Sequence, residues 1–430
     1  MTEKNDHARQ GAPQQNERLR PVSPFSNPLH HGHHAVDPDV QERLKQLEAQ
    51  YANPTTEPLP KLASDPVWDL EHVIGDGAVK LVQDTGQLAL HVVGDTGFNS
   101  YPIRNATATI EFGKANPHFE QAEESVIARM VKDCDPDDIR RGPAFLLHLG
   151  DVIYFDNTES GYASQFYEPF ALCPRKIVAI PGNHDCEVHL GHQLKSLDAF
   201  VANFCMDQPG VPQAARYIHP LREMVAQPAV YWRLDAPFVQ IIGLCSNVGE
   251  NEGALQGGQA GTAQYTWLAQ TLKQVAAEQS QLKKANKQRR ALVVAVHHPP
   301  YTTGNHIGSV QMNKDLDQAF HDAGVWPDAV LAAHDHMYER FTRIKDGVEI
   351  PYCVVGGGGR YFAQQDKSGD GPPIPIPGVE RACAGNGNGY GILTASPGRV
   401  RFDYYPVDNL DKNRPDSWLI DLATGKLRRP

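Results

Sequence analysis

Residues 146–154 read Leu-Leu-His-Leu-Gly-Asp-Val-Ile-Tyr, and this stretch decides the fold class. The apolar run over residues 144–149 predicts a buried strand that stops at Gly150. Asp151 and Tyr154 follow directly. The carboxyl end of a strand in a parallel α/β sheet is where ligands bind, so these residues indicate a site. Taken alone, they fit a turn with a half-buried tyrosine equally well.

Four other predicted strands end in polar residues of the same kind. We place these strands at residues 88–93, 176–180, 291–296 and 329–333. The residues that follow them are Asp95; Asn183 and His184; His297; and His334 and His336. A lone buried histidine is usually a satisfied core residue, and a lone Gly-Asp is usually a turn. Five such coincidences in one chain favour a single site at one edge of a sheet.

The side chains at these five strand ends suit two metal ions better than one. Two such ions sit about 3.5–4 Å apart and need a shared ligand. Asp151 is the candidate for sharing, because a carboxylate has two oxygens. The absence of cysteine from the set argues against a structural zinc site. A phenol loses its proton only near pH 10, so a phenolate ligand at milder pH favours a strongly charged, ferric ion.

The rest of the chain predicts a layered α/β fold with part of its sheet antiparallel. We expect helices at residues 120–132, 264–290 and 313–323 and closing strands at 390–394 and 400–405. We also expect an edge strand at 78–82, a hairpin of residues 230–234 and 238–244, and a surface loop at 366–389. Before these come a disordered arm rich in His, Gln and Pro at residues 1–35, and a helix with a Pro-rich linker at 36–66.

Composition excludes several classes of partner. The 430 residues include 40 Lys and Arg against 51 Asp and Glu, a net charge of −11, which predicts no nucleic-acid-binding face. No apolar run is long enough to cross a membrane. The polar N-terminus lacks a signal-peptide core, so we expect a cytoplasmic protein unless a leader has been removed. The seven cysteines contain no CxxC pair and indicate reduced thiols.

The ordered motifs resemble those of the calcineurin-like metallophosphoesterases, and among these they are most similar to the purple acid phosphatases. Gly97 stands where most of that superfamily has a histidine, and Tyr154 lies three residues after the second aspartate, as in the purple acid phosphatases. The motifs are Gly94-Asp95-Thr96-Gly97, Gly150-Asp151-Val152-Ile153-Tyr154, Gly182-Asn183-His184-Asp185, Val294-Ala295-Val296-His297 and His334-Asp335-His336-Met337-Tyr338-Glu339-Arg340. The likeness covers residues 88–360, and Ala333 departs from it by replacing a glycine.

The resemblance implies an α/β/β/α sandwich of mixed sheets, with a metal site at the carboxyl ends of strands and a catalytic domain over residues 67–430. It implies an Fe(III) ion held by Asp95, Asp151, Tyr154 and His336. It also implies a divalent iron, zinc or manganese ion held by Asp151, Asn183, His297 and His334. A shift of one residue in strand register would exchange His297 for His298.

Two further histidines receive catalytic roles from the resemblance. His184 would contact the phosphate and stabilise charge as the leaving group departs. His306 lies nine residues after His297, where the family has a histidine that binds phosphate or protonates the leaving group. The role of His306 depends on spacing alone, and the alternative is an ordinary loop histidine.

The implied reaction is hydrolysis of a small phosphate monoester by a metal-bound hydroxide. One alternative is a phosphodiesterase that acts on nucleotides or lipid head groups with the same metals. Another is a metal-bound scaffold that binds a partner without chemistry. A further alternative is that the His-rich arm at residues 1–35 delivers metal ions or binds a partner. The oligomeric state is not determined by the sequence.

Overall fold

The computed structural model describes residues 65–428 apart from several short segments. These segments are residues 99–102, 105–109, 112–116, 188–195, 249–252, 257, 305, 307 and 361–377. The predicted arm at residues 1–35, and all but the last two residues of the predicted helix and linker at 36–66, lie outside the described residues.

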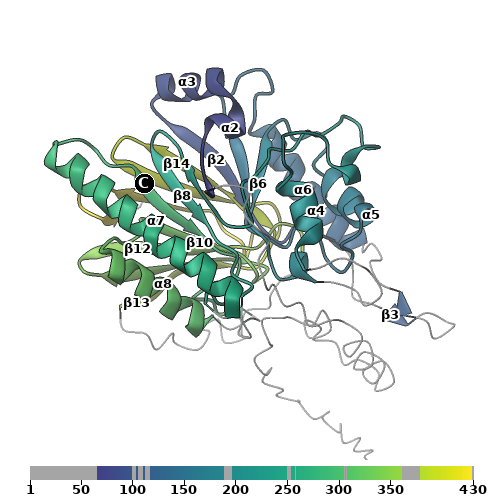
Figure 1. The fold of residues 1–430 in the computed structure, drawn as a ribbon. Helices are drawn as coiled ribbons and strands as arrows, with labels where there is room; N and C mark the ends of the chain where they lie inside the picture. Colours follow the sequence, from purple (N-terminus) through teal and green to yellow (C-terminus); the bar gives the residue numbers. More distant parts are fainter. Residues whose placement is uncertain are drawn as a thin grey trace, which may run out of the picture.

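Two mixed sheets form the centre of the described chain (Figure 1). The first sheet has the strand order β1-β7-β8-β9-β10-β12-β11-β13. Its strands are β1 (Val67–Asp69), β7 (Trp232–Asp235), β8 (Val239–Gly243), β9 (Ala291–Ala295), β10 (Ala329–Ala332), β12 (Val348–Val355), β11 (Tyr338–Lys345) and β13 (Val379–Gly385). Strands β8, β9, β10 and β12 are parallel, whereas β11 and β13 are antiparallel to their neighbours.

The second sheet has the strand order β17-β16-β15-β14-β2-β5-β6. Its strands are β17 (Lys426–Arg428), β16 (Asp416–Asp421), β15 (Arg399–Pro406), β14 (Gly389–Ser396), β2 (Leu88–Val93), β5 (Phe145–His148) and β6 (Lys176–Ala179). Strands β2, β5 and β6 are parallel, and the others pair antiparallel. A separate ribbon consists of β3 (Ile103–Arg104) and β4 (Ile110–Glu111).

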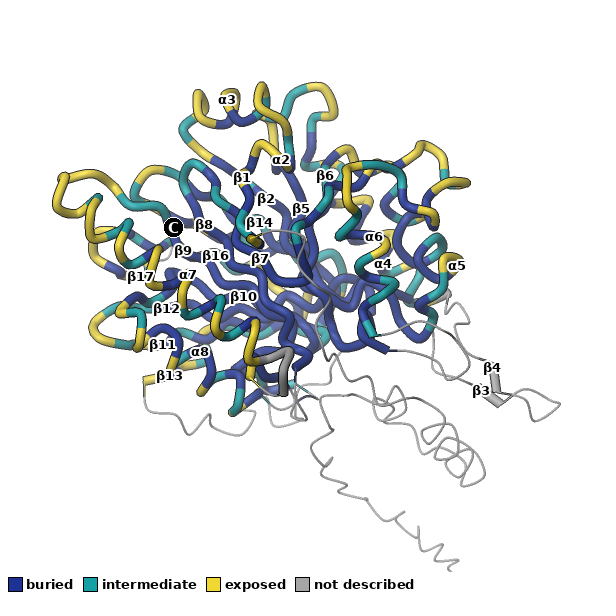
Figure 2. Tube along the Cα trace, viewed as in Figure 1, coloured by how far each residue is buried: buried dark blue, intermediate teal, exposed yellow. Residues whose placement is uncertain are grey.

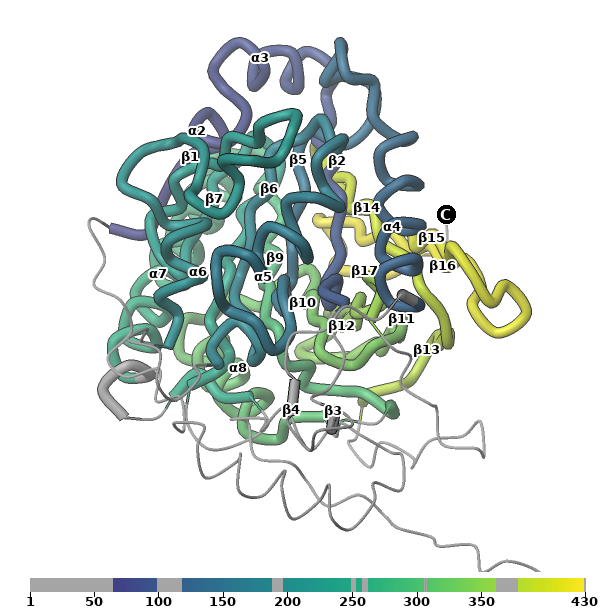
Figure 3. Tube along the Cα trace, turned by 90° about the vertical axis from the view of Figure 1, so that its right-hand side faces the viewer, coloured from purple at the N-terminus to yellow at the C-terminus, as the bar shows by residue number. Residues whose placement is uncertain are grey.

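Helices cover the outer faces of the two sheets. Figures 1 and 3 show α7 (Gly258–Lys284) and α8 (Val310–Ala323) on one side. On the other side lie α4 (Pro117–Lys132), α5 (Glu159–Tyr162) and α6 (Asp198–Phe204). The other helical segments are α2 (Glu71–Ile74), α3 (Asp76–Thr85), η1 (Ala163–Tyr167), η2 (His184–Cys186) and η3 (Gln213–Ala215). The structure is therefore the layered α/β/β/α sandwich that the sequence predicts.

The central strands are buried on both faces, which explains their unbroken apolar sequences. In β9, Val293 packs in the apolar layer between the sheets, and Val294 packs in the core on the helix-covered side. Both side chains are fully buried. Figure 2 shows the same pattern across the molecule, with buried strands inside and exposed residues on the outer helices and turns. The strand ends are therefore held on a rigid scaffold.

Several sequence predictions are wrong at the edges of the fold. Residues 78–82 lie in helix α3 instead of an edge strand, because Val79 and Val82 bury one helical face between Gly75 and Gly86. Residues 379–385 of the predicted loop form β13, which pairs with β11. The long helix α7 ends at Lys284, six residues before the predicted end at residue 290. No prediction covered β11, β16 or β17.

Candidate metal centre

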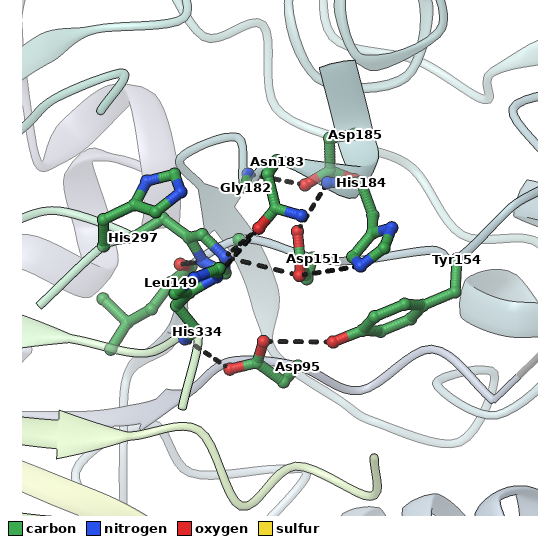
Figure 4. A network of polar contacts seen from close by, with 12 residues as sticks. Asp95, Leu149, Asp151, Tyr154, Gly182, Asn183, His184, Asp185, His297 and His334 are labelled. Atoms are coloured by element: carbon green, nitrogen blue, oxygen red, sulfur yellow. Dashed lines mark hydrogen bonds and ion pairs between the residues drawn. The ribbon is translucent and has the colours of Figure 1, made fainter. Parts of the chain in front are cut away.

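Polar residues follow five parallel strands and gather at one place (Figure 4). Asp95 follows β2, Asp151 follows β5, Asn183 follows β6, His297 follows β9 and His334 follows β10. The first three strands belong to one sheet and the last two to the other. The site therefore lies where the carboxyl ends of parallel strands from both sheets meet. The sequence predicts the strand ends, but it places them at the edge of a single sheet, whereas two sheets supply the donors.

One group of donors surrounds the amide oxygen of Asn183. Its Oδ1 lies 3.1 Å from Nε2 of His297 and 2.9 Å from Nδ1 of His334. Asp151 joins this group, because its Oδ2 lies 3.3 Å from Nε2 of His297. Asp151, His297 and His334 each offer a ligand atom within 4.8 Å of the other two, and all three residues are buried.

A second group of donors surrounds the phenol of Tyr154. The hydroxyl of Tyr154 donates a hydrogen bond of 3.1 Å to Oδ1 of Asp95, and it lies 3.1 Å from Nε2 of His336. The third side of this triangle, from Nε2 of His336 to Oδ1 of Asp95, is 3.6 Å. The other oxygen of Asp95 accepts the backbone N–H of His334 at 2.9 Å, which connects the two groups.

Three of these residues have backbone conformations that side chains rarely adopt. Asp95, Asp151 and His334 have φ angles of 59°, 52° and 68°. Left-handed residues other than glycine are uncommon and cluster at functional sites, because the surrounding structure must compensate the strain. Neighbouring glycines make the close packing feasible: a Cβ atom at Gly182 would lie 2.1 Å from Oδ1 of Asp151.

Gly97 makes room for the phenol. A Cβ atom at Gly97 would lie 2.8 Å from Cδ2 of Tyr154 and 2.9 Å from Cα of Ile153, closer than side chains tolerate. The Tyr154 ring can therefore occupy this place because residue 97 has no side chain. The departure at Ala333 is accommodated in a similar way, because a Cβ atom at Gly94 would lie 2.5 Å from the methyl group of Ala333.

The cluster concentrates acidic groups in a buried place. Burial raises the pKa of Asp95 well above its usual value; His297 opposes this, and the carboxylate of Asp151 adds to it. Burial also raises the pKa of the Tyr154 phenol, with Asp95 and Asp151 contributing. Burial lowers the pKa of His297, but Asp151, Asp95 and the Leu149 carbonyl together raise it to about 9. Carboxylate, amide and phenol oxygens with imidazole nitrogens are ligands for hard and borderline metals, so the residues present fit metal ions.

The two candidate catalytic histidines both lie at the cluster. Nε2 of His184 is 4.0 Å from Oδ2 of Asp151, and the ring centroid of His184 is 4.3 Å from that of Tyr154. The ring of His306 lies 4.1 Å from that of His334, centroid to centroid. By contrast, Nδ1 of His298 lies 2.9 Å from the hydroxyl of Ser246. His297, not His298, thus faces Asp151 and Asn183.

Sequence reasoning missed two charged residues at the site. The guanidinium carbon of Arg360 lies 4.0 Å from the ring centroid of Tyr154, and the side chain is 3% exposed. Burial lowers the pKa of Arg360 to about 10, although the neighbouring Tyr154 phenol acts to raise this pKa. Oε1 of Glu187 lies 2.8 Å from Nδ1 of His184. The spacing of three residues from His184 was a signal for Glu187, whereas nothing in the sequence placed Arg360 beside Tyr154.

The chain belongs to the calcineurin-like phosphoesterase family, whose model matches residues 89–338, more than half of the chain. The resemblance inferred from the motifs is thereby confirmed. The family depends on binuclear metal centres, and this chain carries a cluster that can hold a metal ion. All seven cysteines are free, as predicted, and no helix among the described residues is long and apolar enough to cross a bilayer.

Individual proteins resemble the chain to a modest degree. Probable purple acid phosphatase 20 from Arabidopsis thaliana is 27% identical over 244 residues, which are 54% of this chain and 50% of the plant protein. The chain thus spans about half the length of this curated relative. Among solved structures, GAP50, the anchor in the inner membrane complex of Plasmodium, has a TM-score of 0.47 at 12% identity over 76% of this chain and 87% of its own. PhoD has a TM-score of 0.47 at 12% identity over 80% and 71%.

Proposed function

We propose that this chain is a purple acid phosphatase-like enzyme that hydrolyses small phosphate monoesters with two metal ions. One observation carries the proposal: donors from five strand ends form two adjacent groups, which the hydrogen bond from the His334 backbone to Asp95 connects. The plant relative, a probable purple acid phosphatase, supports the same function.

The two groups of donors supply the ligand assignment. Asp95, Tyr154 and His336 would hold an Fe(III) ion, because a buried phenol serves as a ligand only beside a strongly charged cation. Asn183, His297 and His334 would hold a divalent iron, zinc or manganese ion. Asp151 would touch both ions. When bound, the ions supply charge that neutralises the phosphate oxygens and lowers the pKa of water.

Two histidine side chains supply the rest of the proposed chemistry. His184 lies next to Tyr154, and His306 lies next to His334. A histidine beside the leaving oxygen provides positive charge or a proton as the phosphorus–oxygen bond breaks. Within this proposal, His184 serves the leaving group and His306 helps to bind the phosphate.

Parallel assays of a monoester and a diester on one preparation test this function. With p-nitrophenyl phosphate and bis(p-nitrophenyl) phosphate, we expect kcat/KM to be at least about tenfold higher for the monoester. A preference for the diester would establish the phosphodiesterase alternative. Metal-loaded protein that cleaves neither ester would establish the scaffold alternative. The Asp151→Asn variant, purified identically, controls for contaminating phosphatases.

A further inference from the structure

The His184 side chain has close neighbours at Nδ1, around its ring and at Nε2. Oε1 of Glu187 lies 2.8 Å from Nδ1, and both side chains are almost fully buried. The ring packs against Tyr154 with centroids 4.3 Å apart and meets Phe155 edge-on at 5.0 Å. The opposite edge, at Nε2, faces Oδ2 of Asp151 at 4.0 Å. Contacts at Nδ1 and on the ring thus leave Nε2 directed at the proposed metal centre (Figure 4).

The backbone around Glu187 is fixed as well. His184 begins the short helix η2, which ends at Cys186, and Glu187 follows it directly, so a single turn brings the two side chains together. The Asn157 side chain, which is 5% exposed, donates hydrogen bonds of 2.5 Å to the Glu187 carbonyl and 3.5 Å to the His184 carbonyl. Neither oxygen of the Glu187 carboxylate accepts a hydrogen bond from a described residue, so its approach to Nδ1 of His184 is an ion-pair contact. A buried carboxylate is costly unless it is paired, so the contact with His184 calls for an explanation.

We propose that Glu187 is a positioning residue that orients His184 toward the leaving group of the substrate. This inference rests on the proposed phosphatase function. By accepting the proton on Nδ1, Glu187 fixes the ring so that Nε2–H faces the oxygen that departs from phosphorus. As the phosphorus–oxygen bond breaks, its electron pair stays on that oxygen, which takes the proton from Nε2. Nδ1–H remains with Glu187, and solvent restores the proton on Nε2.

The leaving group provides the readout that separates positioning from a purely structural role. p-Nitrophenolate is a weak base and departs without a proton, whereas the alkoxide of glycerol 2-phosphate needs one. We expect Glu187→Leu, of similar size, to lower kcat for glycerol 2-phosphate about tenfold or more, and for p-nitrophenyl phosphate less than about twofold. Glu187→Gln keeps an acceptor at the same place and should restore most of the loss. If Glu187→Leu does not fold, Glu187→Asp withdraws the carboxylate by one methylene and is expected to give the same substrate-dependent loss.

A double-mutant cycle with His184 decides whether Glu187 acts through it. In a His184→Asn background, Glu187→Leu should lower kcat for glycerol 2-phosphate no further. Equal losses on both esters, or an undiminished loss in the His184→Asn background, would overturn the inference while leaving the phosphatase function intact. A wild-type protein inactive on both esters would overturn the proposed function, and this inference with it. Metal content and thermal unfolding of each variant verify that the comparison is made on folded, equally loaded protein.

Discussion

The hydroxyl of Tyr154 lies 3.1 Å from Nε2 of His336, although 182 positions separate the two residues in the chain. Tyr154 follows a strand of the second sheet, and His336 lies between β10 and β11 of the first. The contact forms because the carboxyl ends of both strands point to the same edge of the sandwich. With Asp95, the pair makes a three-donor group that neither sheet supplies alone.

Removing the phenol oxygen should abolish the colour of an iron-loaded protein. Phenolate bound to Fe(III) gives a visible charge-transfer band, so Tyr154→Phe is expected to lose it. Tyr162→Phe is the matched control, because Tyr162 is also fully buried and its hydroxyl takes no part in either donor group. Absorption spectra of the two variants at equal iron content provide the measurement. A band that survived in Tyr154→Phe would exclude phenolate ligation.

Arg360 should tune that same band. Its guanidinium lies over the Tyr154 ring, and a cation over an aromatic face lowers the energy of the ring electrons. Replacing it with methionine raises the energy of the phenolate electrons, so the charge-transfer band of Arg360→Met is expected to move to longer wavelength. Arg360→Lys retains the positive charge and should shift the band less. An Arg360→Met spectrum that coincides with the wild type would show that the guanidinium does not act on the phenolate.

A side chain at position 97 should displace Tyr154. We expect Gly97→Ala to lower the free energy of unfolding by about 1–3 kcal/mol, because its methyl group would overlap Tyr154 and Ile153. Gly77→Ala is the control: position 77 lies in helix α3 with open space around it, and alanine there should stabilise by about 0.5–1 kcal/mol. Urea unfolding of both variants is the measurement. Equal stability of Gly97→Ala and the wild type would contradict the close packing.

Glu123 should make stability depend on pH. Burial raises its pKa well above the usual value, and the nearby Thr96 hydroxyl offsets this only in part. A raised acid pKa favours folding below the unfolded pKa of about 4.3, and this contribution is lost as pH rises through the folded pKa. Glu123→Gln avoids the charge, so we expect it to be more stable than the wild type at pH 7 by on the order of 1 kcal/mol.

The comparison at low pH and with a neighbouring residue completes this test. At pH 4 the stability advantage of Glu123→Gln should shrink, because the wild-type carboxyl is then protonated in the folded state and largely protonated in the unfolded chain. Glu120→Gln changes the same charge on the same helix at a partly exposed position and should alter stability less. Denaturant unfolding at both pH values gives the free energies. A Glu123→Gln protein that is less stable than the wild type at pH 7 would show that Glu123 is charged and satisfied.

The sequence predicts the centre of the fold better than its edges. Central strands such as β9 are apolar on both faces, and the polar residue that ends each of them stands out. At the edges, alternation is weak: Val79 and Val82 suit a strand or a helix, and only packing selects helix α3. Strand β13 follows a Gly- and Pro-rich segment, and its side chains alternate only partly between buried and exposed.

The residues of the candidate site could likewise be predicted from the sequence only in part. Its donors come directly after predictable strands, so the sequence places Asp95 and Asp151 near each other without coordinates. Arg360 comes after four glycines, and only the folded path of the chain brings it over Tyr154. Glu187 is an intermediate case. Its spacing of three residues from His184 can be read from the sequence, but its burial beside that histidine cannot.

Metal content tests the paired site most directly. Asn favours the left-handed backbone of position 151 but is neutral, so Asp151→Asn preserves the conformation while it removes the shared carboxylate. Elemental analysis of protein loaded with iron and zinc should find two metal ions per chain in the wild type and no more than one in the variant. A single ion in the wild type, or two ions retained in Asp151→Asn, would contradict the account.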